Sequence, residues 1–381
     1  MIETSAQDST WHSSSAARIR VFQTEPQSDG RWEAFVNSHP NGTIYHHPAW
    51  INVIQREYGQ SGEHLACEDE GGRLLAVLPM FHTKGLPSNL GGRLTGRRLS
   101  SLPRTPLAGP LSKNRDATVA ILREAVSRAL LNPRISLQIK TLGPDLDGLV
   151  DGIVSIPWRH SYVLELPHGP KASFRVPDAR ERAKIRWAVN KAAKLGLSVR
   201  SAQTEADLQA WYRLYLETMR RSAVPPRAYR FFADLWKSLR PRGMMDLLLA
   251  ELANIEPKVI IAGSVFLHFG STVWYAFSGM TRKHSSFRAN DAIQWRAINE
   301  ACERGYRYFD FGEVPHGHTE LARFKSKWGA QPVQLHRYYA PPPCSVNELY
   351  EAPSRSLAQS LWCRLPLKVT AWLGDHVYSY L

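Results

Sequence analysis

The second half of the chain alternates strand and helix patterns in an order that few folds accommodate. Apolar residues spaced about two apart predict strands at residues 197–201, 244–252, 259–269, 272–278, 306–311 and 332–339. Between them, apolar residues at helical spacing predict helices at residues 205–222, 229–239, 291–304 and 318–328. The expected order is β-α-α-β-β-β-α-β-α-β. It predicts an α/β (α+β) fold in which helices cover a mixed, mainly antiparallel sheet.

The first half repeats this order less clearly. Strands are expected at residues 19–23, 64–68, 73–82, 135–141 and 162–166, and helices at residues 32–37, 49–58 and 117–131. Two copies of one fold, without close sequence identity, therefore account for most of the 381 residues. The expected domains are residues 18–170 and 171–340, with a disordered polar tail at 1–17 and an extension at 341–381.

The formal net charge of +14 favours an anionic partner. Such a partner would be a phosphorylated metabolite, a nucleic acid or an anionic membrane surface, and a solvated basic face explains the charge equally well. Part of the charge is concentrated on an expected helix that carries Arg180, Arg182, Lys184, Arg186, Lys191 and Lys194.

The remaining bulk features exclude several classes of protein. The four cysteines lie far apart and form no C-x-x-C pair, so neither a metal site nor a redox pair is expected. No apolar run reaches the roughly 18 residues of a membrane-spanning helix, and the polar N-terminus is unlike a secretion signal. The expected location is the cytoplasm, with peripheral membrane contact as an alternative. For the extension, packing onto the first domain is favoured over membrane contact.

Two segments carry a more specific signal. Residues 305–313 read Gly-Tyr-Arg-Tyr-Phe-Asp-Phe-Gly-Glu, and residues 321–329 read Leu-Ala-Arg-Phe-Lys-Ser-Lys-Trp-Gly. Together they resemble the signature of the FemAB/FemX-type peptidoglycan-bridge aminoacyltransferases. Further similarity at residues 182–196, 274–279 and 290–295, and looser similarity at residues 45–50 and 74–80 of the first half, extend the resemblance over roughly residues 19–340.

The resemblance implies two tandem GNAT domains, that is, acyl-CoA N-acyltransferase-like or BioF2-like acetyltransferase domains. It also implies an enzyme that moves an acyl or aminoacyl group, from aminoacyl-tRNA or an acyl-CoA and without a metal, to an amine. The amine would belong to a cell-envelope precursor, in peptidoglycan or exopolysaccharide biogenesis.

Two departures from the family pattern concern the substrates. GNAT enzymes that use acetyl-CoA hold its pyrophosphate with a glycine-containing loop, whereas the matching residues 282–291 contain no glycine. The muropeptide-using enzymes commonly carry an arginine after the Asp-Phe-Gly stretch, where this chain has Glu313. Two alternatives therefore stay open: a small-molecule N-acetyltransferase that uses acetyl-CoA, and a non-catalytic anion-binding module.

Four residues are candidates for catalysis. Lys325 falls on the family's Phe-Lys position, where a lysine steadies negative charge, and a solvated helix lysine is equally expected. Asp310 and Glu313 flank Gly312 at a strand end, where a carboxylate acts as a general base or binds a cation; Asp310 also suits a turn. His316, in the next loop, is a candidate proton carrier or an ordinary loop histidine.

Candidates for substrate binding lie on several expected elements. Tyr275 and Ser278 lie on the strand that GNAT folds splay from its neighbour to admit an acyl group, although Tyr275 also suits the core. Asn290 is the expected N-cap of the helix that follows. The resemblance and the basic clusters add Trp50, Arg97, Arg98, Arg186, Lys191, Arg323 and Trp328. The arginines of the first-domain loop and the basic helix are expected to form one anion cleft, although a scatter over unrelated faces is equally open.

Overall fold

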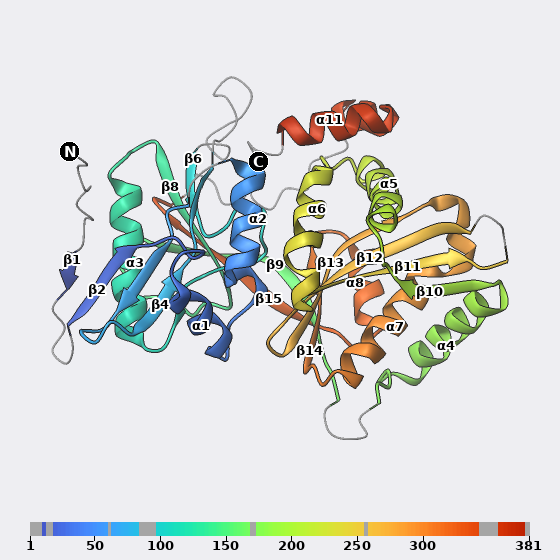
Figure 1. The fold of residues 1–381 in the computed structure, drawn as a ribbon, viewed down its shortest axis with the longest axis horizontal. Coiled ribbons are helices and arrows are strands. Elements are labelled where there is room, and N and C mark those ends of the chain that lie inside the picture. The colour runs from blue at the N-terminus through green and yellow to red at the C-terminus, as the bar shows by residue number, and fades with distance from the viewer. Residues whose placement is uncertain are drawn as a thin grey trace. The chain divides into compact units, whose positions relative to one another are not determined.

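The computed structural model describes residues 10–12, 18–59, 62–83, 97–167, 173–254, 258–342 and 357–377 (Figure 1). The chain divides into two units. Unit 1 comprises Met1–Trp158, Gln334–Tyr350 and Ser379–Leu381, and unit 2 comprises Arg159–Val333 and Glu351–Tyr378. Each unit folds around a hydrophobic core of its own.

Unit 1 contains a sheet of strand order β1-β2-β3-β4-β7, in which every neighbouring pair is antiparallel. A second group pairs β5 with β6 antiparallel and β6 with β8 parallel. The elements are β1 (Thr10–His12), β2 (Ile19–Gln23), α1 (Gly30–Ser38), η1 (Ile44–His46), α2 (Pro48–Tyr58), β3 (Leu65–Glu68), β4 (Leu74–Leu78), β5 (Phe81–Thr83), β6 (Arg97–Ser100), β7 (Leu111–Ser112), α3 (Arg115–Leu130) and β8 (Ile135–Leu142).

Unit 2 is built on the strand order β10-β11-β12-β13-β14-β9, antiparallel except for the pair β13–β14. Helices α5 and α6 cover one face of this sheet, and α7 and α4 cover the other (Figure 1). The elements that follow β8 along the chain are β9 (Val154–Glu165), α4 (Ala179–Lys194), β10 (Leu197–Ser201), α5 (Glu205–Arg221), α6 (Tyr229–Ser238), η3 (Arg240–Arg242), β11 (Met245–Leu252), β12 (Val259–Phe269), β13 (Thr272–Met280), η4 (Arg282–Phe287), α7 (Ala289–Glu303), β14 (Tyr308–Val314), α8 (Thr319–Ser326) and β15 (Gln331–Ala340), of which β15 returns to unit 1. This confirms the expected fold class.

Two strands join a different unit from the one that the sequence suggests. Residues 160–165 of β9 pair with β14 in unit 2, whereas residues 335–340 of β15 pair with β8 in unit 1. The expected division at residue 170 assigns both strands the other way. A period-two pattern shows that a segment is a strand, but it does not show which sheet the strand joins, so local sequence gives no sign of this exchange.

The N-terminal tail contains a strand where the sequence predicts disorder. Thr10–His12 form β1 and pair antiparallel with Ile19–Val21 of β2. The cause is the edge of the sheet, since an edge strand offers unpaired backbone groups to any segment that reaches it. The rest of the tail lies outside the described residues.

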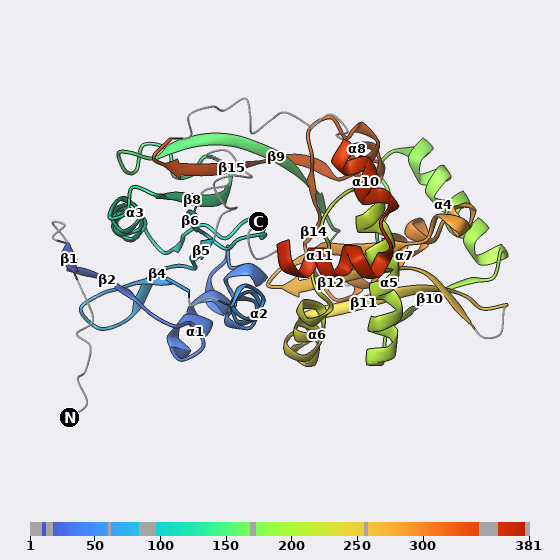
Figure 2. The same ribbon diagram turned by 90° about the horizontal axis from the view of Figure 1, so that it is seen from above.

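The two described helices of the C-terminal extension belong to unit 2, whereas the sequence favours packing of the extension onto the first domain. Its helices are α10 (Leu357–Arg364) and α11 (Leu367–Val377), and both lie against α5 (Figure 2). Arg230 and Asp375 form an ion pair at 2.7 Å. A Cβ at Gly374 would lie 2.5 Å from the Pro226 carbonyl oxygen, so α11 sits directly on the link between α5 and α6. Among the described helices, none is both long enough and apolar enough to cross a bilayer.

The start of α5 shows how local sequence fixes a helix boundary. Thr204 Oγ1 accepts a hydrogen bond from the Asp207 backbone N–H, and the Asp207 carboxylate accepts one from the Thr204 N–H, which is a reciprocal capping box. Arg200 donates two more bonds to this carboxylate, at 2.7 and 3.0 Å. These contacts, with the Arg200 bonds as the largest influence, lower the pKa of Asp207 to about 2.

We expect Asp207→Asn to lower the free energy of unfolding by about 1 kcal/mol at pH 7, because one capping acceptor and the ion pair are lost. A carboxylate with a depressed folded-state pKa stabilises above its unfolded pKa near about 4, and this contribution disappears as pH falls toward the folded-state value. Urea unfolding at pH 7, 5 and 3 should therefore show the difference between wild type and variant shrinking at the lowest pH. A difference that stays constant would contradict the ionic part of this account.

Candidate functional site

The parallel pair at the centre of the unit 2 sheet is short. Pairing between β13 and β14 runs from Thr272–Tyr308 to Trp274–Asp310 and ends there. Both strands are irregular at this point, because β13 carries the extra residue Ala276 opposite β12, and β14 shifts its register against β9 after Asp310. Such bulges release backbone groups from the ladder. The two strands therefore open beside the segment that carries the sequence signature.

Gly312 makes the turn at this opening possible. Its φ of +78° lies in the left-handed region, which a side chain disfavours. A Cβ at this position would stand 3.7 Å from the Tyr275 carbonyl oxygen and 4.0 Å from Lys325 Nζ. The bulge of β14 therefore brings the backbone of β13 and the lysine of α8 to the same place.

Asp310 is 8% exposed at the end of the paired segment. Its Oδ1 accepts hydrogen bonds from Ser161 Oγ at 2.5 Å and from the Gly312 N–H at 2.7 Å. Burial raises the pKa of Asp310, and it outweighs these bonds and the charge of Lys325, which act in the opposite direction. Asp310 shapes the turn, and its raised pKa also suits a group that takes up and releases a proton.

Lys325 is 3% exposed, which excludes the alternative of a solvated helix lysine. Its Nζ donates to the Gly312 carbonyl at 2.7 Å and to the Glu313 carbonyl at 2.9 Å. Burial lowers the pKa of Lys325 to about 8, although the charges of Asp310 and Glu313 oppose the shift. An ammonium group withdrawn from water interacts strongly with any charge that develops next to it.

Glu313 points its carboxylate toward an arginine that the sequence did not single out. Glu313 Oε2 lies 3.5 Å from Arg159 Nη1, and both side chains are partly exposed. Arg159 belongs to β9, so the strand exchange brings it to this edge of unit 2. The pair offers both signs of charge to a ligand that approaches the end of β14.

A pocket of about 170 Å³ lies beside the end of β14. His316, the fourth catalytic candidate, lines it together with His318, Tyr162 and His160 of β9. The pocket therefore gathers three histidine side chains beside the end of β14. In the part of the chain that the structure describes, no cluster of His, Cys, Asp or Glu has the arrangement of a metal site.

A group of polar side chains is buried between β12, β13 and α7. Burial raises the pKa of the Tyr275 hydroxyl, while its neighbours Ser278, Ser264 and Gln294 lower it. Gln294 is buried, and among the described residues neither of its amide atoms nor Ser264 Oγ has a hydrogen-bond partner. Ser278 pairs with Ser264 across the two strands. The Tyr275 hydroxyl is the polar group that lies closest to these buried atoms, and buried polar groups are costly unless such neighbours satisfy them.

The other residues of unit 2 that the sequence predicted to bind substrate lie in positions that give less support to that role. Asn290 is not the N-cap, because α7 begins at Ala289, two residues before the expected start, and Arg288 is the cap; Asn290 Nδ2 donates to Met280 Sδ. Arg323 is exposed on α8. Trp328 is fully buried in the core of unit 2, which argues against its predicted contact with substrate.

The basic candidates fall on both units. Arg186 is exposed on α4, and Lys191 lies over the ring of Trp187 on the same helix. Arg97 and Arg98 lie on β6 of unit 1, so the single anion cleft that the sequence predicts would join two units and stays a prediction. Trp50 of α2 is buried in unit 1 against Tyr45, which argues against a binding role.

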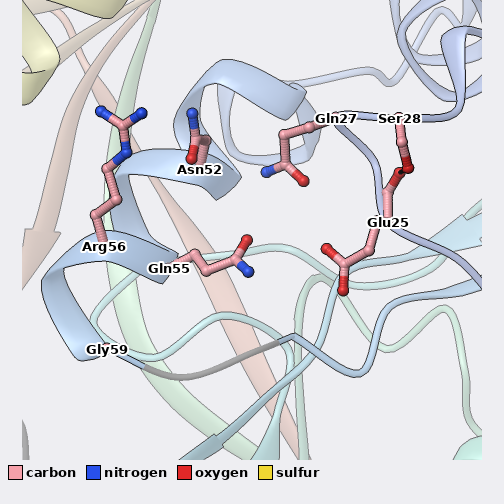
Figure 3. A pocket seen from close by; sticks show the side chains of 7 residues that line it. All are labelled: Glu25, Gln27, Ser28, Asn52, Gln55, Arg56 and Gly59. Carbon is pink, nitrogen blue, oxygen red and sulfur yellow. Dashed lines mark hydrogen bonds between the residues drawn. The ribbon is translucent and has the colours of Figure 1, made fainter.

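A wide polar pocket of about 740 Å³ lies on unit 1, outside the region of the sequence signature. Figure 3 shows the side chains of Glu25, Gln27 and Gln55 turned toward a common space between α2 and the segment before α1. Arg56 of α2 completes the rim. None of its lining residues was predicted from the sequence to bind a ligand.

Sequence reasoning did not find several residues that complete the site. Ser161 and Arg159 reach it only because β9 joins unit 2, and no local pattern reports that event. Gln294 had a detectable signal, since it is a polar residue between the apolar Ile293 and Ala297 on a buried helical stripe. The exposed Trp187 on a basic helix face was a second such signal.

Residues 179–326 match the family model of the acetyltransferase (GNAT) domain. The fold is similar to the crystal structure of FemX, with a TM-score of 0.64 and 18% identity over 83% of this chain and 96% of that chain. It is also similar to the C-terminal domain of a putative lysylphosphatidylglycerol synthetase from Agrobacterium fabrum, with a TM-score of 0.56 and 10% identity over 84% and 92%. A third similar structure is L-PGS from Bacillus licheniformis, with a TM-score of 0.52 and 14% identity over 86% of this chain and 98% of that chain. No curated protein matches the chain significantly.

At such low identities, the similarity to these solved structures shows likeness of fold alone. The family match adds that residues 179–326 are similar in sequence to the acetyltransferase (GNAT) domain. The matched segment runs from α4 to α8 and includes Asp310, Glu313 and Lys325. The expected resemblance to the FemAB/FemX proteins is thereby confirmed. The chain has the fold of FemX, and its residues 179–326 form an acetyltransferase (GNAT) domain, which is the domain of an acyltransferase enzyme.

Proposed function

We propose that this protein transfers an acyl or aminoacyl group, from an acyl-CoA or an aminoacyl-tRNA, to an amine at the opening between β13 and β14. The observation that carries the proposal is the buried combination of Lys325 and Asp310 at this opening. The lysine has a lowered pKa and the aspartate a raised one, and such opposed shifts are typical of sites that move protons and stabilise charge. The fold alone would not support this choice, because one fold serves many functions.

In the proposed reaction the acceptor first loses one proton from its ammonium group to solvent. The amine nitrogen then attacks the acyl carbonyl carbon, a C–N bond forms, and the ester C–O or thioester C–S bond breaks. The Lys325 ammonium stabilises the negative charge that develops on oxygen. Asp310 takes the second amine proton and returns it to the departing alcohol or thiol, so that the carboxylate is regenerated. Glu313 attracts the cationic acceptor, and His316 is the alternative proton carrier.

Product formation tests the proposal directly. The purified protein is incubated with acetyl-CoA or with aminoacyl-tRNA and a panel of amines, and acylated products are measured by mass spectrometry. We expect one donor to support product formation. If both donors bind but neither yields any product, the protein is an anion-binding module and the transfer proposal fails.

We further propose that the acceptor is an amine-bearing precursor of the cell envelope. The support is the similarity of fold to FemX and to a protein named as a lysylphosphatidylglycerol synthetase, together with the net charge of +14, which favours an anionic precursor. The reaction would then take place in the cytoplasm, with peripheral contact to the membrane. Muropeptide, amino-sugar and aminolipid acceptors, compared at equal concentration, discriminate this proposal from a preference for small soluble amines.

The pH dependence of transfer should report the lysine. Because the pKa of Lys325 is lowered to about 8, its ammonium form predominates below that pH and is lost above it. With an acceptor amine whose own pKa lies below 7, the turnover number should therefore decline above pH 8, by about tenfold per unit at most. Lys325→Arg keeps its charge throughout this range and should abolish the decline, even if its rate is lower. If the turnover number of Lys325→Arg still declined above pH 8, the decline would come from the titration of another group.

A further inference from the structure

The two described helices of the C-terminal extension turn one side toward unit 2 and the other toward solvent. On α11, Thr370 and Gly374 are buried, and Gly374 lies directly against Pro226 in the link between α5 and α6. In the bend between α10 and α11, the Leu365 carbonyl accepts a hydrogen bond from Arg220 of α5 at 3.1 Å. Because both helices lie against α5, these contacts fix which of their side chains face outward (Figure 2).

The outward side carries large apolar side chains. Leu361 on α10 is 64% exposed, and Val369 and Trp372 on α11 are 38% and 59% exposed. Val369 and Trp372 are three residues apart, so they share one stripe of the helix. The ring of Trp372 lies 4.4 Å from that of His376, which is also exposed. Single exposed apolar residues are normal on a protein surface, but three of them within 12 residues indicate a surface for interaction.

The charged groups among these side chains have one sign. Arg364 and Lys368 are exposed on the same two helices, and the sequence contains no Asp or Glu between Glu351 and Asp375. The Asp375 carboxylate is already paired with Arg230 at 2.7 Å. The outward side is therefore positive as well as apolar. We call it the extension face, and its residues are Leu361, Arg364, Lys368, Val369 and Trp372.

This combination of side chains fits an anionic bilayer better than it fits another macromolecule. Tryptophan favours the headgroup region, aliphatic side chains enter the boundary of the acyl chains, and arginine and lysine are attracted to anionic headgroups. A nucleic acid would stack a base on Trp372 and leave Leu361 and Val369 in water. The core of an interface between proteins is depleted in lysine, whereas Lys368 adjoins Val369. The charge and the aliphatic side chains together therefore select a lipid surface.

We propose that the extension face docks unit 2 onto the surface of an anionic lipid bilayer. Leu361, Val369 and Trp372 enter the headgroup region, and Arg364 and Lys368 contact the lipid phosphates. With three apolar side chains and two cations, this docking should be reversible and should weaken as the salt concentration rises. Its use to the cell rests on the proposed function, because a docked enzyme reaches an acceptor that the membrane carries. Docking itself requires no transfer.

Co-sedimentation of the full-length protein with lipid vesicles tests the extension face. Vesicles of phosphatidylcholine and phosphatidylglycerol in equal parts should bind the protein more tightly than vesicles of phosphatidylcholine alone. Trp372→Ser should weaken binding to both kinds about tenfold. Lys368→Glu should weaken binding to the anionic vesicles about 10- to 30-fold and barely change binding to the neutral ones. Two matched controls, Trp187→Ser on α4, where the side chain is 54% exposed, and Lys237→Glu on α6, should bind as the wild type does.

Four outcomes would overturn the proposal: no binding to the anionic vesicles, equal losses in Trp372→Ser and Trp187→Ser, tighter Trp372-dependent binding to a mixed-sequence RNA than to vesicles, or a dimer that Trp372→Ser dissociates in sedimentation velocity. The last would identify a second copy of the chain as the occupant. Trp372 and Lys368 are exposed, so circular dichroism should show both variants to be folded. Lys325→Met should bind vesicles as the wild type does. Vesicle binding that depends on Trp372, without transfer from any donor, would support the extension face and refute the proposed reaction.

Discussion

Replacing Lys325 with methionine should reduce kcat for acyl transfer by a factor of about 100 to 1,000, the loss typical of removing one preorganised stabilising group. The methionine side chain has a similar length and fills the buried space that the lysine occupies. The two carbonyls of Gly312 and Glu313 each lose a donor, which costs free energy. The removal of a buried charge offsets this cost. We therefore expect the free energy of unfolding to change by only about 1–2 kcal/mol.

The comparison that isolates the site is Lys325→Met against Lys237→Met. Lys237 is exposed on α6, away from the opening between β13 and β14. Lys237→Met therefore makes the same change in net charge without altering the site. Steady-state kinetics should show wild-type activity in Lys237→Met and a loss confined to kcat in Lys325→Met. Equal activity in the two variants, both shown to be folded, would remove Lys325 from the catalytic machinery.

The sequence predicted the parts of this site that lie close together along the chain. Asp310, Glu313 and Lys325 fall within 16 residues, on a strand, a turn and the next helix, so their proximity follows from local structure. The burial of Asp310 and Lys325 was less evident. An apolar residue at position 325 would have indicated a core position, but a lysine indicates a surface, and the hydrogen bonds to the β14 backbone reverse that expectation.

The parts that escaped prediction come from distant segments. Ser161 bonds to Asp310 across 149 positions of sequence, through a strand that the domain division assigned to the other half. The pairing of β9 with β14 depends on the whole topology, and no property of residues 159–165 specifies it. Arg288 and Trp187 likewise meet because α4 packs on α7, although each segment taken alone reads only as basic.

Substitution of Gly279 by alanine should lower the free energy of unfolding by about 3 kcal/mol, near the upper end of what overpacking costs. Gly279 lies on β13 opposite Gly263 of β12, beneath α5. A Cβ at Gly279 would lie 2.4 Å from the Tyr215 backbone nitrogen and 2.7 Å from the Leu214 carbonyl carbon. These atoms belong to the middle of α5, so no side-chain rotation relieves the contact and the helix must move as a body.

Alanine substitutions at two other glycines, Gly263 and Gly30, serve as controls for Gly279→Ala. A Cβ at Gly263 would meet two side chains, Trp211 Cδ1 at 2.6 Å and Leu249 Cδ2 at 2.8 Å, and one backbone atom, the Leu248 carbonyl oxygen at 3.1 Å. Since its closest contacts are with side chains, which can adjust, and its backbone contact is longer than the 2.4 Å at Gly279, Gly263→Ala should cost less than Gly279→Ala. Gly30, at the start of α1, has open space around its Cβ position, so Gly30→Ala should fall within about 0.5 kcal/mol of wild type. Urea unfolding should rank the variants in this order. A Gly279→Ala protein as stable as Gly30→Ala would show that α5 does not rest on β13 as closely as the structure places it. Because β13 also carries Tyr275 and Ser278, the displaced helix should lower acyl transfer along with stability.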